Sequence, residues 1–299
     1  MTAYAPYLPE GLLPDPLPPR ESTWLDHRGY RVHVERVGDP GAPDCVVLLH
    51  GAGGHAEMLW PFAAAIAAHG VYVLVPDLPE YGRTRAASPG RVRYSDWVDL
   101  AARVVKAQSD SHAGRLVIVG ASMGGLLGYD VATRTGVVDG LVATCLLDPS
   151  DARARRAMAR PSWLGPIAPA LLKIIAGPLA NLRVPIRWLA KMDAISDNPA
   201  IRAAVLADPL GGGNRIPLGF LRTFLTSRPA VPPERARVPV VLAHPADDRW
   251  TPVEVSMPFL DRLAGPTEVV MLPNAGHLPM EQPGAGRLIQ AVVTMARGR

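Results

Sequence analysis

The sequence is poor in the features that mark secreted, membrane-spanning and nucleic-acid-binding proteins. It has only two cysteines, Cys45 and Cys145, and both lie in apolar runs where buried free thiols are expected. No uninterrupted apolar run reaches the roughly 18 residues that a membrane-spanning helix needs. The first twenty residues lack the basic and apolar regions of a signal peptide. We therefore expect a cytoplasmic protein with no stable membrane insertion.

Long runs of positive charge are also missing, although the chain is mildly basic. Its formal net charge is +4 and its pI is near 9.3, but lysine and arginine are spread along the chain. This distribution does not favour nucleic acid as a partner. The 299 residues are 48% hydrophobic and 19% charged, which suits one large α/β domain or two smaller ones. A homo-oligomer is compatible with this composition.

Apolar runs of strand length alternate with helix-like segments along most of the chain. A proline-rich lead-in covers residues 1–21, and residues 22–27 and 30–37 then alternate in polarity as a β-hairpin does. Six further runs have the length of buried strands: 45–50, 71–76, 115–120, 141–147, 238–244 and 267–272. Helices are expected at 59–69, 95–109, 122–135, 253–263 and 284–297. This rhythm predicts a mostly parallel, eight-stranded sheet flanked by helices, formed by residues 22–150 and 238–299.

Residues 151–237 interrupt this rhythm. The segment offers no convincing strand, and its helix-like pieces are separated by prolines and by a run of three glycines. Five such pieces are expected: residues 151–160, 168–176, 185–192, 199–207 and 218–227. Because a structureless loop of this length is uncommon, we interpret the segment as a helical cap inserted over the ends of the sheet.

A candidate nucleophile follows the expected strand 115–120. The sequence Gly120-Ala121-Ser122-Met123-Gly124 fits the G-x-S-x-G pattern of a sharp strand-to-helix turn, which lifts a serine hydroxyl above the sheet. An ordinary glycine-rich turn has the same composition. The chemical interpretation therefore depends on a base, an acid and an oxyanion site elsewhere in the chain.

A serine hydroxyl needs a base to take its proton, and His277 follows the last expected strand, at the same sheet edge as Ser122. A carboxylate must then fix the imidazole and stabilise its charged form. Asp248 is the preferred candidate, because it follows strand 238–244 and gives the chain order Ser, Asp, His. Asp247 and Asp148 are alternatives. Each of the three carboxylates would otherwise cap a turn.

Two backbone amides are candidates for the oxyanion hole. The amide of Met123 follows the serine at a helix N-terminus, and that of Ala52 lies in the glycine-rich loop after strand 45–50. Gly51 in this loop allows the backbone to approach a substrate closely. His50 and His55 flank the loop, but nothing nearby completes a metal coordination set, so no metal or cofactor is predicted.

Taken together, the motifs LLHGAGG, VPDLPEYGRT, GASMGG, HPADDRWTP and NAGHLPMEQP resemble those of the α/β-hydrolase superfamily, and the resemblance covers nearly all of residues 22–298. It implies the α/β-hydrolase fold with an inserted cap. It also implies these roles: nucleophile Ser122, base His277, acid Asp248, and oxyanion donors Ala52 and Met123.

The chain departs from the common family pattern at Glu80 and Thr84, where related sequences often have glycine and serine. The departures leave the candidate triad intact. Serine at the nucleophile position argues against the dehalogenase and epoxide-hydrolase branches, which use aspartate there.

We therefore expect a serine hydrolase that cleaves small to medium apolar carboxylic esters through an acyl-enzyme, as carboxylesterases and lipases do. The same triad also serves thioesterases, carbon–carbon bond hydrolases and cofactor-free perhydrolases, and a non-catalytic ligand-binding member of the fold would share it. Substrate contacts are predicted for Gly51, Trp60, Trp188, Phe220, Phe224, Trp250 and Leu278.

Four arginines gather at the start of the expected cap: Arg153, Arg155, Arg156 and Arg160. We interpret them as a solvated helix face. Recruitment of an anionic interface is the weaker alternative.

Overall fold

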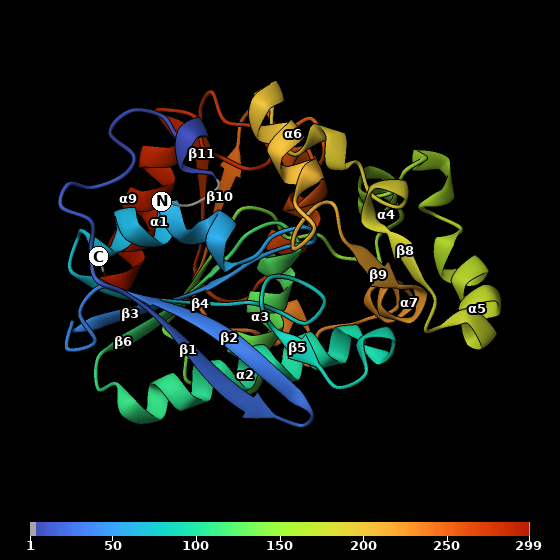
Figure 1. Cartoon of the computed structure of the whole chain (residues 1–299), viewed down its shortest axis with the longest axis horizontal. Helices are drawn as coiled ribbons and strands as arrows, with labels where there is room; N and C mark the ends of the chain where they lie inside the picture. Colours follow the sequence, from blue (N-terminus) through green and yellow to red (C-terminus); the bar gives the residue numbers. More distant parts are fainter. Residues whose placement is uncertain (1–3, 299) are drawn as a thin grey trace.

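The computed structural model describes residues 4–298, which form one large mixed sheet flanked by helices (Figure 1). Its main path runs in the order β1-β2-β4-β3-β6-β7-β10-β11. The strands are β1 Arg20–His27, β2 Tyr30–Val37, β3 Asp44–Leu49, β4 Val71–Pro76, β6 Arg115–Gly120, β7 Gly140–Ala143, β10 Val240–Pro245 and β11 Thr267–Leu272. β2 pairs antiparallel with β1 and β4, and all later neighbours pair in parallel. The predicted mostly parallel sheet is confirmed.

Two strands of the large sheet differ from the prediction. A short strand β5 (Arg85–Ala86) pairs with β2 and was not expected. Strand β7 is shorter than the predicted 141–147, because the chain leaves the sheet after Ala143. The hydroxyl of Thr144 then accepts a hydrogen bond from the amide of Ser122, and the amide of Leu146 donates to the hydroxyl of Ser256. The first bond ties the end of β7 to the strand-to-helix turn, and the second ties it to the residue before α8.

Helices cover both faces of the sheet (Figure 1). α1 (Ala56–Ala67) contacts α9 (Gly284–Ala296), and α2 (Tyr94–Ser111) contacts α3 (Met123–Thr135). The helix predicted at 253–263 is shorter than expected. It consists of a 3-10 turn and the four-residue α8 (Met257–Leu260), which has a proline in its first turn.

The core lies against the parallel strands. Every residue of β4 is buried, and in β6 only Arg115 is partly exposed. Strands covered on both faces need continuous apolar sequence, which explains why these runs could be recognised. Both cysteines are buried free thiols, as expected.

The segment predicted as a cap carries four helices; α4, α5 and α7 lie at the right of Figure 1 and α6 at the top, away from the two ends of the chain. The helices are α4 Ala152–Met158, α5 Ala168–Leu179, α6 Pro199–Ala207 and α7 Leu218–Leu225. The expectation of no strand here is wrong, since β8 (Arg183–Pro185) pairs antiparallel with β9 (Arg215–Pro217). The helix expected at 185–192 is replaced by the end of β8 and short 3-10 turns. Three-residue strands are too short to show an alternating pattern.

Candidate active site

Ser122 sits at the apex of the turn between β6 and α3. Its backbone has φ 54° and ψ −125°, an unfavourable conformation for a residue with a side chain. The chain packs tightly around it. A Cβ on Gly120 would lie 2.2 Å from the carbonyl oxygen of Gly124, and one on Gly124 would lie 2.3 Å from that of Leu49. The two glycines thus allow α3 to start directly over the ends of β3 and β6.

The imidazole of His277 lies between Ser122 and Asp248. Its Nε2 is 2.8 Å from the Ser122 hydroxyl, and its Nδ1 is 2.8 Å from Oδ2 of Asp248. Both His277 and Asp248 are buried. Loops after β10 and β11 deliver these side chains to the sheet edge where β6 ends. The arrangement forms a continuous relay from hydroxyl to imidazole to carboxylate.

Asp248 is held in its charged form by its neighbours. Burial opposes the charge, but the proximity of His277 and several hydrogen bonds lower the pKa of the carboxyl below its usual value. The amides of Trp250 and Thr251 donate to Oδ1 at 2.8 and 2.9 Å, and the Thr251 hydroxyl donates to Oδ2 at 2.9 Å. These bonds also fix the direction in which the carboxylate faces the imidazole.

The two alternative carboxylates lie elsewhere. Asp247 is exposed, next to Asp248 in sequence but turned away from the buried pair. Asp148 caps the amide of Ser150 and lies 3.7 Å from the guanidinium of Arg262. Only Asp248 of the three forms a hydrogen bond with His277.

The loop after β3 lies against Ser122. A Cβ on Gly51 would lie 2.7 Å from the Ser122 Cβ, so this position cannot hold a side chain without displacing the loop. The loop is fixed by His50, whose Nδ1 is 2.8 Å from the Gly51 oxygen and whose Nε2 accepts from the amide of Leu78. Burial lowers the pKa of His50 to about 4, so the ring is neutral at pH 7. Ala52 and Met123 both line the cavity in front of Ser122.

The imidazoles of His50 and His55 form hydrogen bonds within the protein and are not arranged as metal ligands. His55 Nε2 lies 2.7 Å from Asp208 on the cap. Within the described part of the chain, no three His, Cys, Asp or Glu side chains are clustered in a way that could hold a metal ion.

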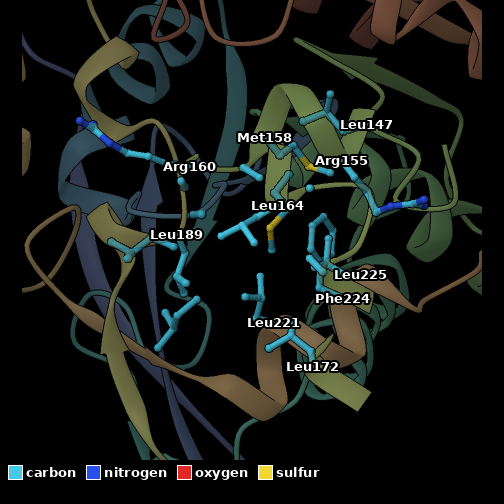
Figure 2. A pocket seen from close by; sticks show the side chains of 18 of the residues that line it. Leu147, Arg155, Met158, Arg160, Leu164, Leu172, Leu189, Leu221, Phe224 and Leu225 are labelled. Atoms are coloured by element: carbon cyan, nitrogen blue, oxygen red, sulfur yellow. The ribbon is translucent and has the colours of Figure 1, made fainter. Parts of the chain in front are cut away.

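A cavity of about 160 Å³ opens between Ser122 and the cap. Its lining is almost entirely apolar and comes mostly from α4, α5, α7 and the segments between them, with Ala52, Met123 and Trp250 on the side of the sheet (Figure 2). Two arginines contribute to the wall, but their guanidinium groups turn away from the centre in Figure 2. That of Arg155 donates to backbone oxygens, and that of Arg160 pairs with Asp193. A bound molecule would therefore meet hydrocarbon beyond the serine hydroxyl.

Three of the predicted substrate contacts line this cavity: Phe220, Phe224 and Trp250. Trp60 and Trp188 do not line this cavity. Trp60 is buried within α1 with the guanidinium of Arg20 over its ring, and Trp188 is 61% exposed on the outside of the cap. Trp60 was expected from its closeness in sequence to the loop after β3, and Trp188 from the apolar composition of residues 151–237, but neither observation indicates which way a side chain faces.

The other two predicted contacts also lie outside the cavity wall. Gly51 packs against the backbone of the nucleophile turn. Leu278 lines a small separate apolar gap beneath α1 and α9. Four further residues line the cavity and were not predicted to do so: Met158, Leu164, Ile186 and Ile216. Their short, proline-interrupted segments gave no usable periodicity.

The segment predicted as a cap is anchored to the loops after β3 and β4 by charged and polar groups. Asp208, just after α6, accepts hydrogen bonds from Tyr4 at 2.6 Å and from His55 at 2.7 Å. Glu80, at the position where glycine is common in related sequences, has φ 78° and pairs with Arg183 of β8 at 2.8 Å. These two contacts link the cap to the loops that follow β3 and β4.

The sequence was compared with family models and with curated proteins. The family model described as "Alpha/beta hydrolase family" matches residues 46–286. A monoacylglycerol lipase of Mycolicibacterium smegmatis is 28% identical over 239 residues, covering 77% of this chain and 81% of that protein.

Solved structures with the same fold include two lipases and an esterase. A soluble variant of the monoglyceride lipase of Saccharomyces cerevisiae superposes with TM-score 0.75 at 15% identity, covering 94% of this chain and 96% of its own. A monoacylglycerol lipase of Paleococcus ferrophilus gives 0.70 at 21%, covering 90% and 99%. A carboxyl esterase of Bacillus coagulans gives 0.73 at 17%, covering 93% and 98%. At these identities the likeness establishes a common fold.

Proposed function

The chain belongs to the alpha/beta hydrolase family, and from this premise we propose that it is a serine hydrolase that cleaves apolar carboxylic esters with Ser122, His277 and Asp248. The observation that carries the proposal is the relay of two 2.8 Å contacts from the Ser122 hydroxyl through the His277 imidazole to the Asp248 carboxylate. A serine hydroxyl in this setting has a base within reach and a buried charge behind that base.

In the first half of the reaction, Ser122 Oγ attacks the ester carbonyl carbon while His277 Nε2 takes the hydroxyl proton. Asp248 stabilises the imidazolium that results. The negative charge that develops on the carbonyl oxygen is accepted by the amides of Met123 and Ala52. The C–O bond to the alcohol then breaks, and the imidazolium returns the proton to the leaving oxygen.

In the second half, water takes the place of the alcohol. His277 removes a proton from the water, the hydroxide attacks the acyl carbon, and the bond to Ser122 Oγ breaks as that oxygen regains a proton. The products are a carboxylic acid and the free enzyme. No cofactor takes part in these steps.

The apolar cavity suits a hydrocarbon acyl group of small to medium length. Side chains such as Leu172, Leu189 and Phe224 surround the space beyond the serine, and they offer dispersion contacts but no charge partner. The relative from Mycolicibacterium smegmatis is a monoacylglycerol lipase. We therefore include monoacylglycerols among the proposed substrates.

A panel of chromogenic esters with acyl chains of increasing length tests this proposal. We expect turnover that rises with chain length until the cavity is filled, and then falls. Ser122→Ala should abolish turnover, while Ser95→Ala, at an exposed serine on the first turn of α2, should leave it unchanged. Ester turnover that survives in Ser122→Ala would refute the proposal.

A further inference from the structure

One side of α5 presents an exposed apolar stripe. Five large aliphatic side chains recur at three- and four-residue spacing, which places them on one side of the helix and the turn before it. They are Ile167, Leu171, Ile174, Ile175 and Leu179, and each is exposed. The adjoining side of the helix packs inward through Leu172 and Ala176. We call the five exposed residues the α5 face.

The exposure is unusual for this molecule. Ile174 is 77% exposed, the largest value among the exposed large apolar side chains of residues 4–298. Two tryptophans, Trp163 and Trp188, are also exposed, on 3-10 turns of the same cap segment. Of the fourteen exposed large apolar residues in the described chain, eight lie between positions 163 and 188. Concentrations of this kind mark interaction surfaces.

The same part of the chain has charge of one sign. Residues 152–192 contain no aspartate or glutamate. They contain eight basic residues: Arg153, Arg155, Arg156, Arg160, Lys173, Arg183, Arg187 and Lys191. The segment thus carries a formal charge of +8 in a chain whose total is +4. Lys173 lies on α5 itself, and Arg187 precedes the exposed Trp188; both basic side chains are exposed.

From the apolar stripe and the one-signed charge together, we propose that the α5 face docks on the surface of an anionic lipid bilayer. Apolar side chains would enter the boundary between headgroups and acyl chains, and the basic groups would meet anionic headgroups. A second copy of this chain is a poorer occupant, because it would bring the same positive charge to the contact.

The docking is peripheral. α5 has twelve residues, which is too short to cross the hydrocarbon core. More generally, the helices found in residues 4–298 include none long and apolar enough to do so.

Docking here would serve the proposed hydrolysis, and this link between docking and catalysis rests on the proposed function. Leu171 belongs to the α5 face and also lines the cavity, and Leu172 beside it lines the cavity from the inner side. An apolar ester leaving the bilayer would therefore reach the cavity past a single helix. In Figure 1 α5 forms the outer edge of the molecule at the right, with no other element beyond it.

Vesicle sedimentation tests the proposal on the full chain. Sucrose-loaded vesicles of phosphatidylcholine alone are compared with vesicles that also contain phosphatidylglycerol, using Ser122→Ala so that no hydrolysis intervenes. We expect clear binding to the anionic vesicles, weak binding to the neutral ones, and a loss of binding as salt is raised.

Matched variants separate the two contributions. Ile174→Ser should weaken vesicle binding about tenfold through lost apolar burial. Val269→Ser, at an exposed valine on β11, should not change it. Lys173→Glu should weaken binding to anionic vesicles by at least about tenfold, and Lys106→Glu on α2 should have no effect. Each of these four substitutions, made with Ser122 intact, should retain turnover of a water-soluble short-chain ester, which verifies the fold.

Two results would overturn the proposal. One is equal binding to neutral and anionic vesicles with no loss in Ile174→Ser. The other is a dimer that Ile174→Ser dissociates, which would assign the α5 face to a second copy. Binding is measured without hydrolysis and hydrolysis without vesicles, so a failure of docking is distinguishable from a failure of the proposed function.

Discussion

At the scale of single residues, Asp248 differs from its neighbour Asp247 by what surrounds it. Asp248 is buried and accepts four hydrogen bonds or contacts, one of them from His277, whereas Asp247 is exposed. Asp248→Asn would remove the charge that stabilises the imidazolium and disturb the tautomer of the ring. We expect kcat to fall by about 10³–10⁴, with a much smaller change in KM. Asp247→Asn is the matched control, and steady-state kinetics on a short-chain ester should find it close to the wild type.

Glu80 gives a pH dependence of stability. Burial raises the pKa of its carboxyl to about 7, although the pair with Arg183 opposes the rise. A carboxyl with a higher pKa in the folded state binds more protons when folded, so this group makes the free energy of unfolding fall between pH 4.5 and about 7. Glu80→Gln should remove that fall, which amounts to roughly 3 kcal/mol. Urea unfolding at both ends of this range measures it. An unchanged pH dependence of the free energy of unfolding in Glu80→Gln would contradict the assignment of this fall to Glu80.

At the scale of elements, the cap is joined through Asp208 to His55, which ends the loop after β3. Burial works against its charge, but the hydrogen bonds from His55 and Tyr4 lower the pKa of Asp208 to about 2. Asp208→Ala would leave both partners unsatisfied, and we expect a loss of about 1–3 kcal/mol in the free energy of unfolding.

The same variant should also slow phosphonylation of Ser122 by a fluorophosphonate, because His55 precedes α1 directly after the loop that holds Ala52. Tyr4→Phe removes only one of the two bonds and should have the smaller effect on both measurements. Tyr72→Phe, which removes a hydroxyl bonded to Arg36 on the sheet, is the control. If Tyr72→Phe slows phosphonylation as much as Asp208→Ala does, the hydrogen bonds of Asp208 do not act specifically on Ser122.

The cavity walls belong to the cap helices, so the cap should set the acyl length. Leu221 of α7 lines the cavity, and Leu221→Trp would fill part of its volume. We expect kcat/KM for the longest accepted ester to fall at least about tenfold, while that for an acetate ester changes little. Leu182→Trp adds the same side chain at an exposed position that does not line the cavity. A uniform loss across all chain lengths would indicate damage to the fold rather than a shorter cavity.

At the scale of the whole molecule, the sequence predicts the sheet better than the cap for a physical reason. Strands such as β4 and β6 are buried on both faces, so each appears as a continuous apolar run with a helix after it. The candidate site also follows from sequence, because Ser122, Asp248 and His277 each lie within a few residues of the end of an expected strand, although β11 before His277 is largely exposed. The geometry agrees with the expected contacts.

The cap could not be predicted in the same way. Its strands β8 and β9 have three residues each, and its helices are short and interrupted by prolines. Aromatic residues there were assigned to the pocket by composition alone, and Trp188 proved to be exposed. The exposure of Ile174 and its neighbours could not be read from sequence either, because an apolar helix face predicts burial by default.

The central claim is that Ser122 carries the acyl group during turnover. Intact-mass and peptide mass spectrometry after brief reaction with a chromogenic ester, or with a fluorophosphonate, tests it most directly. The account predicts one adduct per chain, mapped to the peptide that contains Ser122 and absent from Ser122→Ala. An adduct on another residue, or hydrolysis that continues in Ser122→Ala, would contradict it.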